Sequence, residues 1–181
     1  ESAWSDPEET LSFLLDLAAV GTVGDVVPLT GENRRLVKKG IRRLRDEPCQ
    51  GLRALLKAAG AGEKAVSARD LAFTVVPRLN AVGRMGSPKQ ALRLLLCEDR
   101  EEANEIAQSV NTENDRRRSV EADVLKQAME KLQTEPERLL DRVLVVEGEN
   151  WHPGVIGIVA ARLTETFGKP SVVITLEGDK A

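Results

Sequence analysis

The sequence is poor in the residues that build disulfide frameworks and zinc sites. Among its 181 residues are two cysteines, Cys49 and Cys97, and one histidine, His152. Two cysteines are too few for a disulfide framework and do not form a metal-binding pair, so the composition predicts a reducing, cytoplasmic protein. A single histidine excludes a zinc site with several histidine ligands.

Aromatic residues and long apolar runs are scarce as well. The chain has no tyrosine, three phenylalanines and two tryptophans, which argues against a platform of several aromatics for stacking bases. No apolar run approaches the roughly 20 residues that a bilayer span needs, so we predict no membrane partner. No basic-then-apolar leader opens the chain, and no secretion signal is therefore expected. With 41% hydrophobic residues, the chain can still bury the core of one or two globular domains.

Charge is distributed unevenly along the chain. Residues 1–97 contain 15 Lys and Arg against 11 Asp and Glu, whereas residues 98–181 contain 11 against 18. The first part is therefore basic, although the net charge of the chain is −3. Because local patches set the field that a ligand meets, this net charge does not exclude a polyanionic partner.

Helical patterns dominate the first part of the chain. A start signal at Asp6-Pro7 and the glycine Gly21 bound the first predicted helix, and an apolar turn region with one acid, Asp25, follows over residues 20–29. Residues 67–70 have the pattern of a capping box, and residues 77–86 predict a loop. Further helices are predicted over 31–46, 52–59, 67–75 and from 87 onward, the last with Ala91, Leu92, Leu94, Leu95 and Leu96 available for a core.

The rest of the chain predicts a long helix and then a strand–helix–strand unit. Residues 100–133 lack proline and glycine, and their polar middle is typical of a helix that bridges two bodies through solvent. Residues 142–147 and 171–176 predict strands and residues 155–167 a helix between them, which implies two parallel strands. The fold class is therefore helix-rich α/β. One helix leaves a face of this sheet uncovered, so we expect a partial second domain.

Two groups of polar side chains are candidates for chemistry. Asp25 stands alone in the apolar turn region, where it either binds a hard divalent cation or caps a turn through backbone N–H groups. Arg78, Asn80 and Arg84 surround the predicted loop, and two guanidinium groups with an amide can clamp a phosphate. Alternatively, the arginines pair with nearby acids and Asn80 supports the turn.

Two further features have a binding and a structural interpretation. The basic helix over residues 34–45, with Arg34 and Lys38, can lie on a phosphate backbone or form a solvated face. His152 precedes a predicted helix whose free N–H groups can receive an anion. It can also cap that helix or pack against Trp151. The two cysteines are interpreted as small buried hydrophobes.

Three motifs, taken together and in order, resemble those of one family. They are Gly21-Thr22-Val23-Gly24-Asp25-Val26-Val27-Pro28-Leu29 with Gly31-Glu32-Asn33-Arg34, then Pro77-Arg78-Leu79-Asn80-Ala81-Val82-Gly83-Arg84-Met85, then Trp151-His152-Pro153-Gly154-Val155-Ile156-Gly157-Ile158-Val159-Ala160. They resemble the motifs of the RecJ family, the single-strand-specific 5′-to-3′ DNA exonucleases of the DHH phosphoesterase superfamily. The family usually has alanine where this chain has Gly24.

The resemblance implies roles for the matched residues. Asp25 falls on the last aspartate of a two-metal site for Mn²⁺ or Mg²⁺. Arg78, Asn80 and Arg84 fall in a loop that faces the DNA strand near that site. The implied function is hydrolysis of single-stranded DNA in repair and recombination, with a single-strand-binding protein or a helicase as further partners.

The resemblance covers only the middle of a RecJ-type chain. It implies that residues 1–97 end a DHH catalytic domain, that residues 98–136 form a connector helix and that residues 137–181 begin the DHH-associated C-terminal domain. The family's aspartate pairs and Asp-His-His motif would precede this segment, and its Gly/Ser-Arg-Ser motif would follow it. Most metal ligands would then lie outside this chain, and we expect it to be inactive by itself.

Two other functions fit the same resemblance. One is a non-catalytic DHH-family module that binds DNA within a replication complex. The other is a DHH phosphodiesterase of short oligonucleotides or dinucleotides. The presence of Asp25 favours a working metal site over the non-catalytic module.

Overall fold

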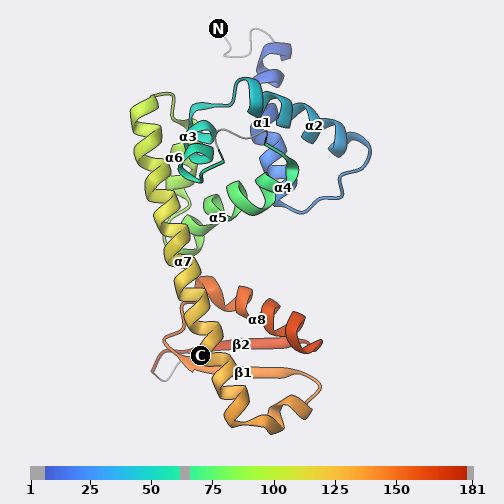
Figure 1. Ribbon diagram of the computed structural model, residues 1–181, viewed down its shortest axis with the longest axis vertical. Coiled ribbons are helices and arrows are strands. Elements are labelled where there is room, and N and C mark those ends of the chain that lie inside the picture. The colour runs from blue at the N-terminus through green and yellow to red at the C-terminus, as the bar shows by residue number, and fades with distance from the viewer. Residues whose placement is uncertain (1–6, 62–65, 179–181) are drawn as a thin grey trace. The chain divides into compact units, whose positions relative to one another are not determined.

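The chain folds into two compact units, each described by itself. The computed structural model describes residues 7–61 and 66–178. The first unit extends to Asn114 and the second begins at Asp115, so helix α7 (Arg100–Thr134) contributes to both (Figure 1). The predicted helix cap Asp6 lies outside the described residues. Within the described part of the chain, no helix is long and apolar enough to cross a membrane.

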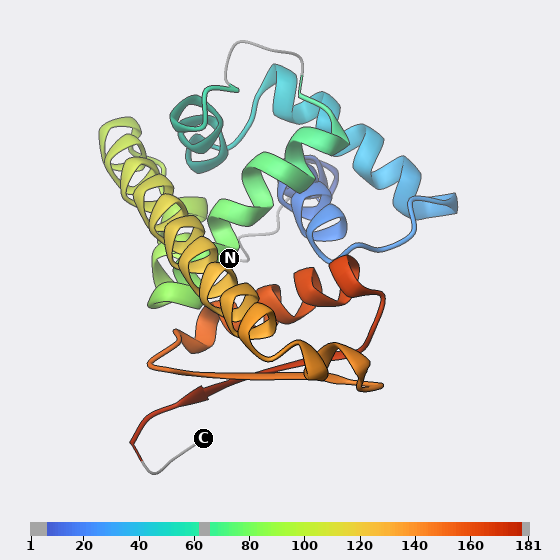
Figure 2. The same cartoon turned by 60° about the horizontal axis from the view of Figure 1, so that its bottom comes forward.

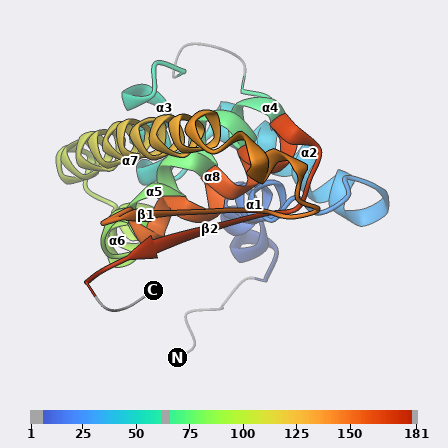
Figure 3. The ribbon, with the colours of Figure 1, turned by 90° about the horizontal axis from the view of Figure 1, so that it is seen from below.

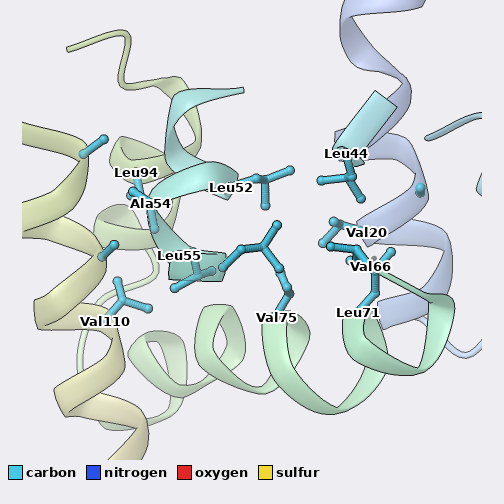
Figure 4. Packing of buried hydrophobic residues seen from close by; sticks show 14 of the residues in the cluster. Val20, Leu44, Leu52, Ala54, Leu55, Val66, Leu71, Val75, Leu94 and Val110 are labelled. Atoms are coloured by element: carbon cyan, nitrogen blue, oxygen red, sulfur yellow. The ribbon is translucent and has the colours of Figure 1, made fainter. Parts of the chain in front are cut away.

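Helices build the first unit, and their apolar faces share one core. The elements are α1 (Pro7–Gly24), α2 (Gly31–Asp46), α3 (Gln50–Ala58), α4 (Ala68–Asp70), the π-helical segment η1 (Leu71–Val75), α5 (Val76–Met85), α6 (Lys89–Leu96) and the first half of α7. Figure 4 shows Leu71 and Val75 of η1 beside Val20 of α1 and Leu52 and Leu55 of α3. The π-helical segment therefore lies at the centre of the packing.

Two glycines let helices in this unit approach to backbone distance. A Cβ atom on Gly40 of α2 would lie 2.2 Å from the carbonyl oxygen of Leu15 and 2.4 Å from the Cβ of Ala19, both on α1. A Cβ atom on Gly51 of α3 would lie 2.0 Å from the carbonyl oxygen of Leu94 on α6. Because backbone atoms cannot turn aside as a flexible side chain can, only glycine fits at these two crossings.

The predicted end of the first helix is wrong, because α1 continues past Gly21 to Gly24. Val20 is buried in the core, and the Thr22 hydroxyl donates to the carbonyl oxygen of Ala18 at 2.7 Å. Packing on the buried face thus outweighs the helix-weakening effect of an exposed glycine, which is about 1 kcal/mol. The apolar turn region is shorter than predicted and begins at Asp25.

The loop predicted over residues 77–86 is also wrong, since helix α5 extends to Met85. Pro77 stands in the first turn of α5, directly after η1, where the N–H of Val76 donates to the carbonyl oxygen of Leu71, five residues back. A proline lacks the N–H that an interior helix position donates. The change of hydrogen-bond spacing at the π-helical segment makes this lack less costly at Pro77. Leu71, Val75 and Val82 are buried at helical spacing, so apolar periodicity decides the structure here.

The remaining predictions for this unit hold with small changes. Helix α2 spans the predicted range, and α3 begins slightly earlier than predicted. The capping box is present: the N–H of Ser67 donates to Oδ2 of Asp70 at 2.9 Å, and the N–H of Asp70 donates to the Ser67 hydroxyl at 3.3 Å. In α6 only part of the predicted core is buried, since Leu92 and Leu96 are 58% and 68% exposed.

The second unit consists of the end of a long helix, followed along the chain by the predicted strand–helix–strand arrangement. After α7 come a 3₁₀ turn η2 (Pro136–Leu140), strand β1 (Leu144–Glu149), helix α8 (Pro153–Phe167) and strand β2 (Ser171–Leu176). The strands are parallel, with Leu144 opposite Ser171. Helix α7 is uninterrupted, as predicted, but its polar middle is not wholly solvated, because Asn114 is 2% exposed.

One face of this small sheet carries the core of the second unit. Figures 2 and 3 show α8 and the end of α7 on the same side of the two strands. The buried apolar residues of this unit are Val124, Ala128, Leu132, Leu144, Val146, Trp151, Val155, Val159 and Leu163. On the strands themselves, Val145 and Val172 are 41% and 46% exposed. The uncovered sheet face expected from a single crossover helix is thus present.

The Gly40 contact generates a stability prediction. We expect Gly40→Ala to lower the free energy of unfolding by about 1–3 kcal/mol, because the added methyl group overlaps the α1 backbone. Gly21→Ala is the matched control: its Cβ would meet nothing within 4 Å, and alanine favours the helix by up to about 1 kcal/mol. Urea denaturation followed by circular dichroism measures both. Equal stability of the two variants would show that α1 and α2 can separate without cost.

Candidate nucleic-acid and metal interface

Asp25 occupies the C-terminal end of α1. Its N–H donates to the carbonyl oxygen of Gly21 at 2.9 Å, and its side chain is exposed. No described residue forms a hydrogen bond or an ion pair with its carboxylate, so the structure gives no support to a turn-capping role. The last carbonyl groups of a helix carry a partial negative charge. Asp25 therefore adds a full negative charge where the backbone already attracts a cation.

Asp25 and Asn80, from two different motifs, line the same hollow in the first unit. This hollow has a volume of about 540 Å³, and its other lining residues are Leu17, Val20, Gly21, Gly24, Val76, Leu79, Leu92, Leu95 and Leu96. A Cβ atom on Gly24 would lie 3.2 Å from Cγ2 of Val76. The end of α1 thus packs tightly against the start of α5. This contact brings the carboxylate and the amide to one place.

The three residues of the predicted phosphate clamp share helix α5 but differ in their surroundings. Asn80 and Arg84 are exposed. Arg78 is half-buried: its Nε donates to Oδ1 of Asn111 on α7 at 2.8 Å, and its Nη1 donates to the carbonyl oxygen of Thr74 at 2.8 Å. Arg78 therefore joins α5 to the first half of α7. These two partners are a side-chain amide and a backbone carbonyl.

Arg34 and Lys38 lie on a basic groove along α2. The groove has a volume of about 810 Å³ and is lined by Leu29, Arg34, Arg35, Val37, Lys38, Lys39, Ile41, Arg42, Arg45, Asp46 and Ala68. The side chains of Arg34 and Lys38 are exposed, and neither is paired with a residue that the structure describes. Both charges are therefore available to a ligand from solution.

His152 caps helix α8. Its Nδ1 accepts a hydrogen bond from the N–H of Gly154 at 3.0 Å. One of the N–H groups that could receive an anion is therefore already used. The neighbouring Trp151 is 3% exposed, and its indole Nε1 donates to Oε1 of Gln127 at 2.9 Å. Of the three interpretations of His152, the structure displays the cap.

Sequence reasoning missed several buried or coupled carboxylates, and Asp16 and Glu147 are two of them. Asp16 is fully buried, and it accepts hydrogen bonds from the N–H of Leu17 at 2.7 Å and of Cys49 at 2.8 Å. Burial raises the pKa of the Cys49 thiol to about 11, and the nearby Asp16 carboxylate adds to this effect. The signal was an acid inside the apolar run of α1. The sequence did not show that the N–H of Cys49, 33 positions away along the chain, is the partner of this acid.

The second missed carboxylate is Glu147 on β1. Nη1 of Arg138 donates to it at 2.8 Å and Nζ of Lys131 at 2.9 Å. These two cations, Arg138 first, lower the pKa of Glu147 to about 2. The network ties α7 and η2 to the sheet. Its role is therefore in the packing of the second unit.

Metal ligands are sparse in the part of the chain that the structure describes. No group of three His, Cys, Asp or Glu residues within 7–61 and 66–178 could hold a metal ion. Asp25 fits a metal site as a single hard oxygen donor. The other ligands of such a site would have to come from elsewhere.

A helical unit followed by a parallel strand–helix–strand unit defines the class of fold as helix-rich α/β. No protein-family model matches the chain. Among curated proteins, it is 42% identical over 159 residues to the single-stranded-DNA-specific exonuclease RecJ of Thermus thermophilus, covering 88% of this chain and 23% of that protein. It is 39% identical over 176 residues to RecJ of Dickeya dadantii, covering 95% of this chain and 30% of that protein.

Solved structures give the same result. RecJ from Thermus thermophilus in complex with Mn²⁺ matches with a TM-score of 0.81 and 38% identity, over 91% of this chain and 24% of that one. Its complex with Mg²⁺ matches with a TM-score of 0.79 and 36% identity, over 91% and 25%. The chain is thus similar in sequence and in fold to a segment of these RecJ proteins, as the three motifs predict. It spans between about a fifth and a third of the length of the curated relatives that it matches.

The cap at α8 generates a second prediction. We expect His152→Ala to destabilise the second unit by about 1 kcal/mol, because the N–H of Gly154 loses its acceptor. His152→Asn should keep most of the stability, since asparagine is a good N-cap. Hydrogen exchange of the Gly154 amide measures the effect locally. If exchange is equally fast in both variants, capping is not what His152 contributes.

Proposed function

We propose that this chain is part of a metal-dependent, single-strand-specific 5′-to-3′ DNA exonuclease of the RecJ type. The observation that carries the proposal is the hollow where Asp25 and Asn80 meet, because it joins two separate motifs at a cation-attracting helix end. The relatives' names, single-stranded-DNA-specific exonuclease, support the substrate class. The related structures in complex with Mg²⁺ and Mn²⁺ support the choice of cation.

In this proposal the residues divide the work by their chemistry. Asp25 is the catalytic residue in the sense that it holds a metal ion through a carboxylate oxygen. Mn²⁺ or Mg²⁺ held there would supply an activated water and would stabilise charge on the phosphate. Asn80 offers an amide to the strand beside the ion, and Arg84 neutralises a phosphate. Arg78 acts on the same strand from α5, which its bonds to Asn111 and Thr74 hold in place.

The proposal extends to domain organisation and setting. Residues 1–97 form the end of the catalytic domain, residues 98–136 the connector helix and residues 137–181 the start of a C-terminal domain. The setting is cytoplasmic DNA repair and recombination, where a single-strand-binding protein or a helicase would present the strand. With one presumed metal ligand, the chain alone is inactive, because removing members of a catalytic group costs far more than a proportional share of rate.

The role of Asp25 can be tested in a chimera. We expect the 181-residue chain alone to leave a 5′-phosphorylated single-stranded oligonucleotide intact in the presence of Mn²⁺. Replacing the matching segment of Thermus thermophilus RecJ by this chain should give an active enzyme. Asp25→Asn in the chimera should lower turnover by about a thousandfold or more.

The control is Glu32→Gln, which removes the same charge from the first turn of α2 and should leave turnover within about twofold. Cleavage by the chain alone that disappears in Asp25→Asn would place a complete metal site within these residues. A chimera that is folded and active, but insensitive to Asp25→Asn, would remove Asp25 from the metal site. A folded chimera that binds the oligonucleotide without cleaving it would favour the non-catalytic DNA-binding module.

A binding measurement tests Arg84. We expect Arg84→Ala to weaken binding of single-stranded oligonucleotides by a similar factor for every sequence, because a phosphate contact carries no base information. The slope of log K against log salt should fall by about 0.7, as loss of one phosphate contact on a single strand predicts. Arg53→Ala, an exposed arginine on α3, is the control. An unchanged slope would assign Arg84 to the structure of α5.

A further inference from the structure

Helix α2 displays a concentration of positive charge that neither the metal site nor α5 uses. Its exposed cations on the groove are Arg34, Arg35, Lys38, Lys39, Arg42 and Arg45. One acid, Asp46, lies at the far end of the groove. Like charges this close on a helix repel one another. A ligand of opposite charge would relieve that repulsion.

Several of these cations have no ion-pair partner among the residues that the structure describes. The side chains of Arg34, Lys38 and Arg42 make no hydrogen bond or ion pair with any residue in the described ranges. Arg45 differs, because its Nε and Nη2 both donate to the carbonyl oxygen of Val66, at 2.9 and 2.7 Å. Arg45 is thus fixed in place at one end of the groove, and the other three are ready to contact an anion.

The spacing of the three cations suits a polyanion with a regular repeat. Arg34, Lys38 and Arg42 are four residues apart, so each step along the helix axis is about 6 Å. Neighbouring phosphates of an extended nucleic-acid strand are separated by a similar distance. The row lies on the helix that follows Asp25 in the chain, since only residues 26–30 separate Asp25 from α2.

The floor of the groove is aliphatic and has no aromatic ring. Leu29, Val37, Ile41 and Ala68 line it between the cations. Stacking of bases, which needs aromatic rings, is therefore not available at this place. Contacts to phosphates would dominate, and such contacts are independent of base sequence.

We propose that α2 is a second strand-binding surface, a phosphate track on which Arg34, Lys38 and Arg42 hold consecutive phosphates of a nucleic-acid strand without any metal ion. The proposal rests on the proposed function for the class of ligand, and it adds a surface that acts by charge alone. The track would carry the part of the strand that is not at the Asp25 end, and so lengthen the stretch of strand that the protein needs for tight binding.

The test measures binding of a single-stranded oligonucleotide to the 181-residue chain in EDTA, by filter binding over a range of salt. We expect Lys38→Glu/Arg42→Glu to weaken binding by at least about tenfold at low salt and to lower the log–log salt slope by about 1.4. The matched control is Arg53→Glu/Lys57→Glu, the same charge change at the same spacing on exposed positions of α3. Circular dichroism checks that both variants are folded.

Each outcome of this binding experiment supports or overturns the proposed phosphate track. Equal weakening in the two double variants would mean that only overall charge matters, and no weakening would mean that the strand does not touch α2; either result overturns the proposal. Displacement by poly-glutamate as effective as by an oligonucleotide of equal charge would assign the groove to acidic peptides instead. Because this binding is measured in EDTA, a failure of the metal-site proposal in the chimera would leave this result standing.

Discussion

The contact between α1 and α2 at Gly40 is the constraint on which the first unit depends. With no side chain at Gly40, the two helices touch through the backbone of Leu15. This fixes how closely α1 and α2 approach at their crossing. The chain carries Asp25 at the end of α1, and α2 carries the cations of the basic row. A packing requirement in the core thereby holds together the two helices that bear these charged features.

These two features carry opposite charges. The end of α1 and Asp25 form a negative point that attracts a cation, while α2 presents a positive stripe that attracts phosphates. A nucleic-acid strand with a divalent ion would match both at once, because we propose that the ion binds where the protein is negative and the strand binds where it is positive. The chain's net charge of −3 conceals this local arrangement.

Sequence patterns predicted elements whose signals are local. Helix α2, the long α7 and both strands follow from periodicity and from the absence of breaking residues. The helix at Pro77 was missed, because a π-helical turn accommodates a proline that ordinary helix rules would reject. Asp25 was singled out through its motif and stays a prediction, whereas the partners of Arg78 and Asp16 were not predicted. Those partners, Asn111 and Cys49, lie 33 positions away along the chain, and only the folded core brings them together.

The packing of Trp151 gives the second unit its own optical reporter. The indole ring lies against Gly148, where a Cβ atom would come within 2.1 Å of it, and its N–H is bonded to Gln127. The chain's other tryptophan is Trp4, so residues 7–114 contain none. With Trp4 replaced by phenylalanine, the fluorescence of the chain would come from a single buried indole. Its emission would then follow the opening of the second unit alone, while circular dichroism, dominated by helices, would follow both.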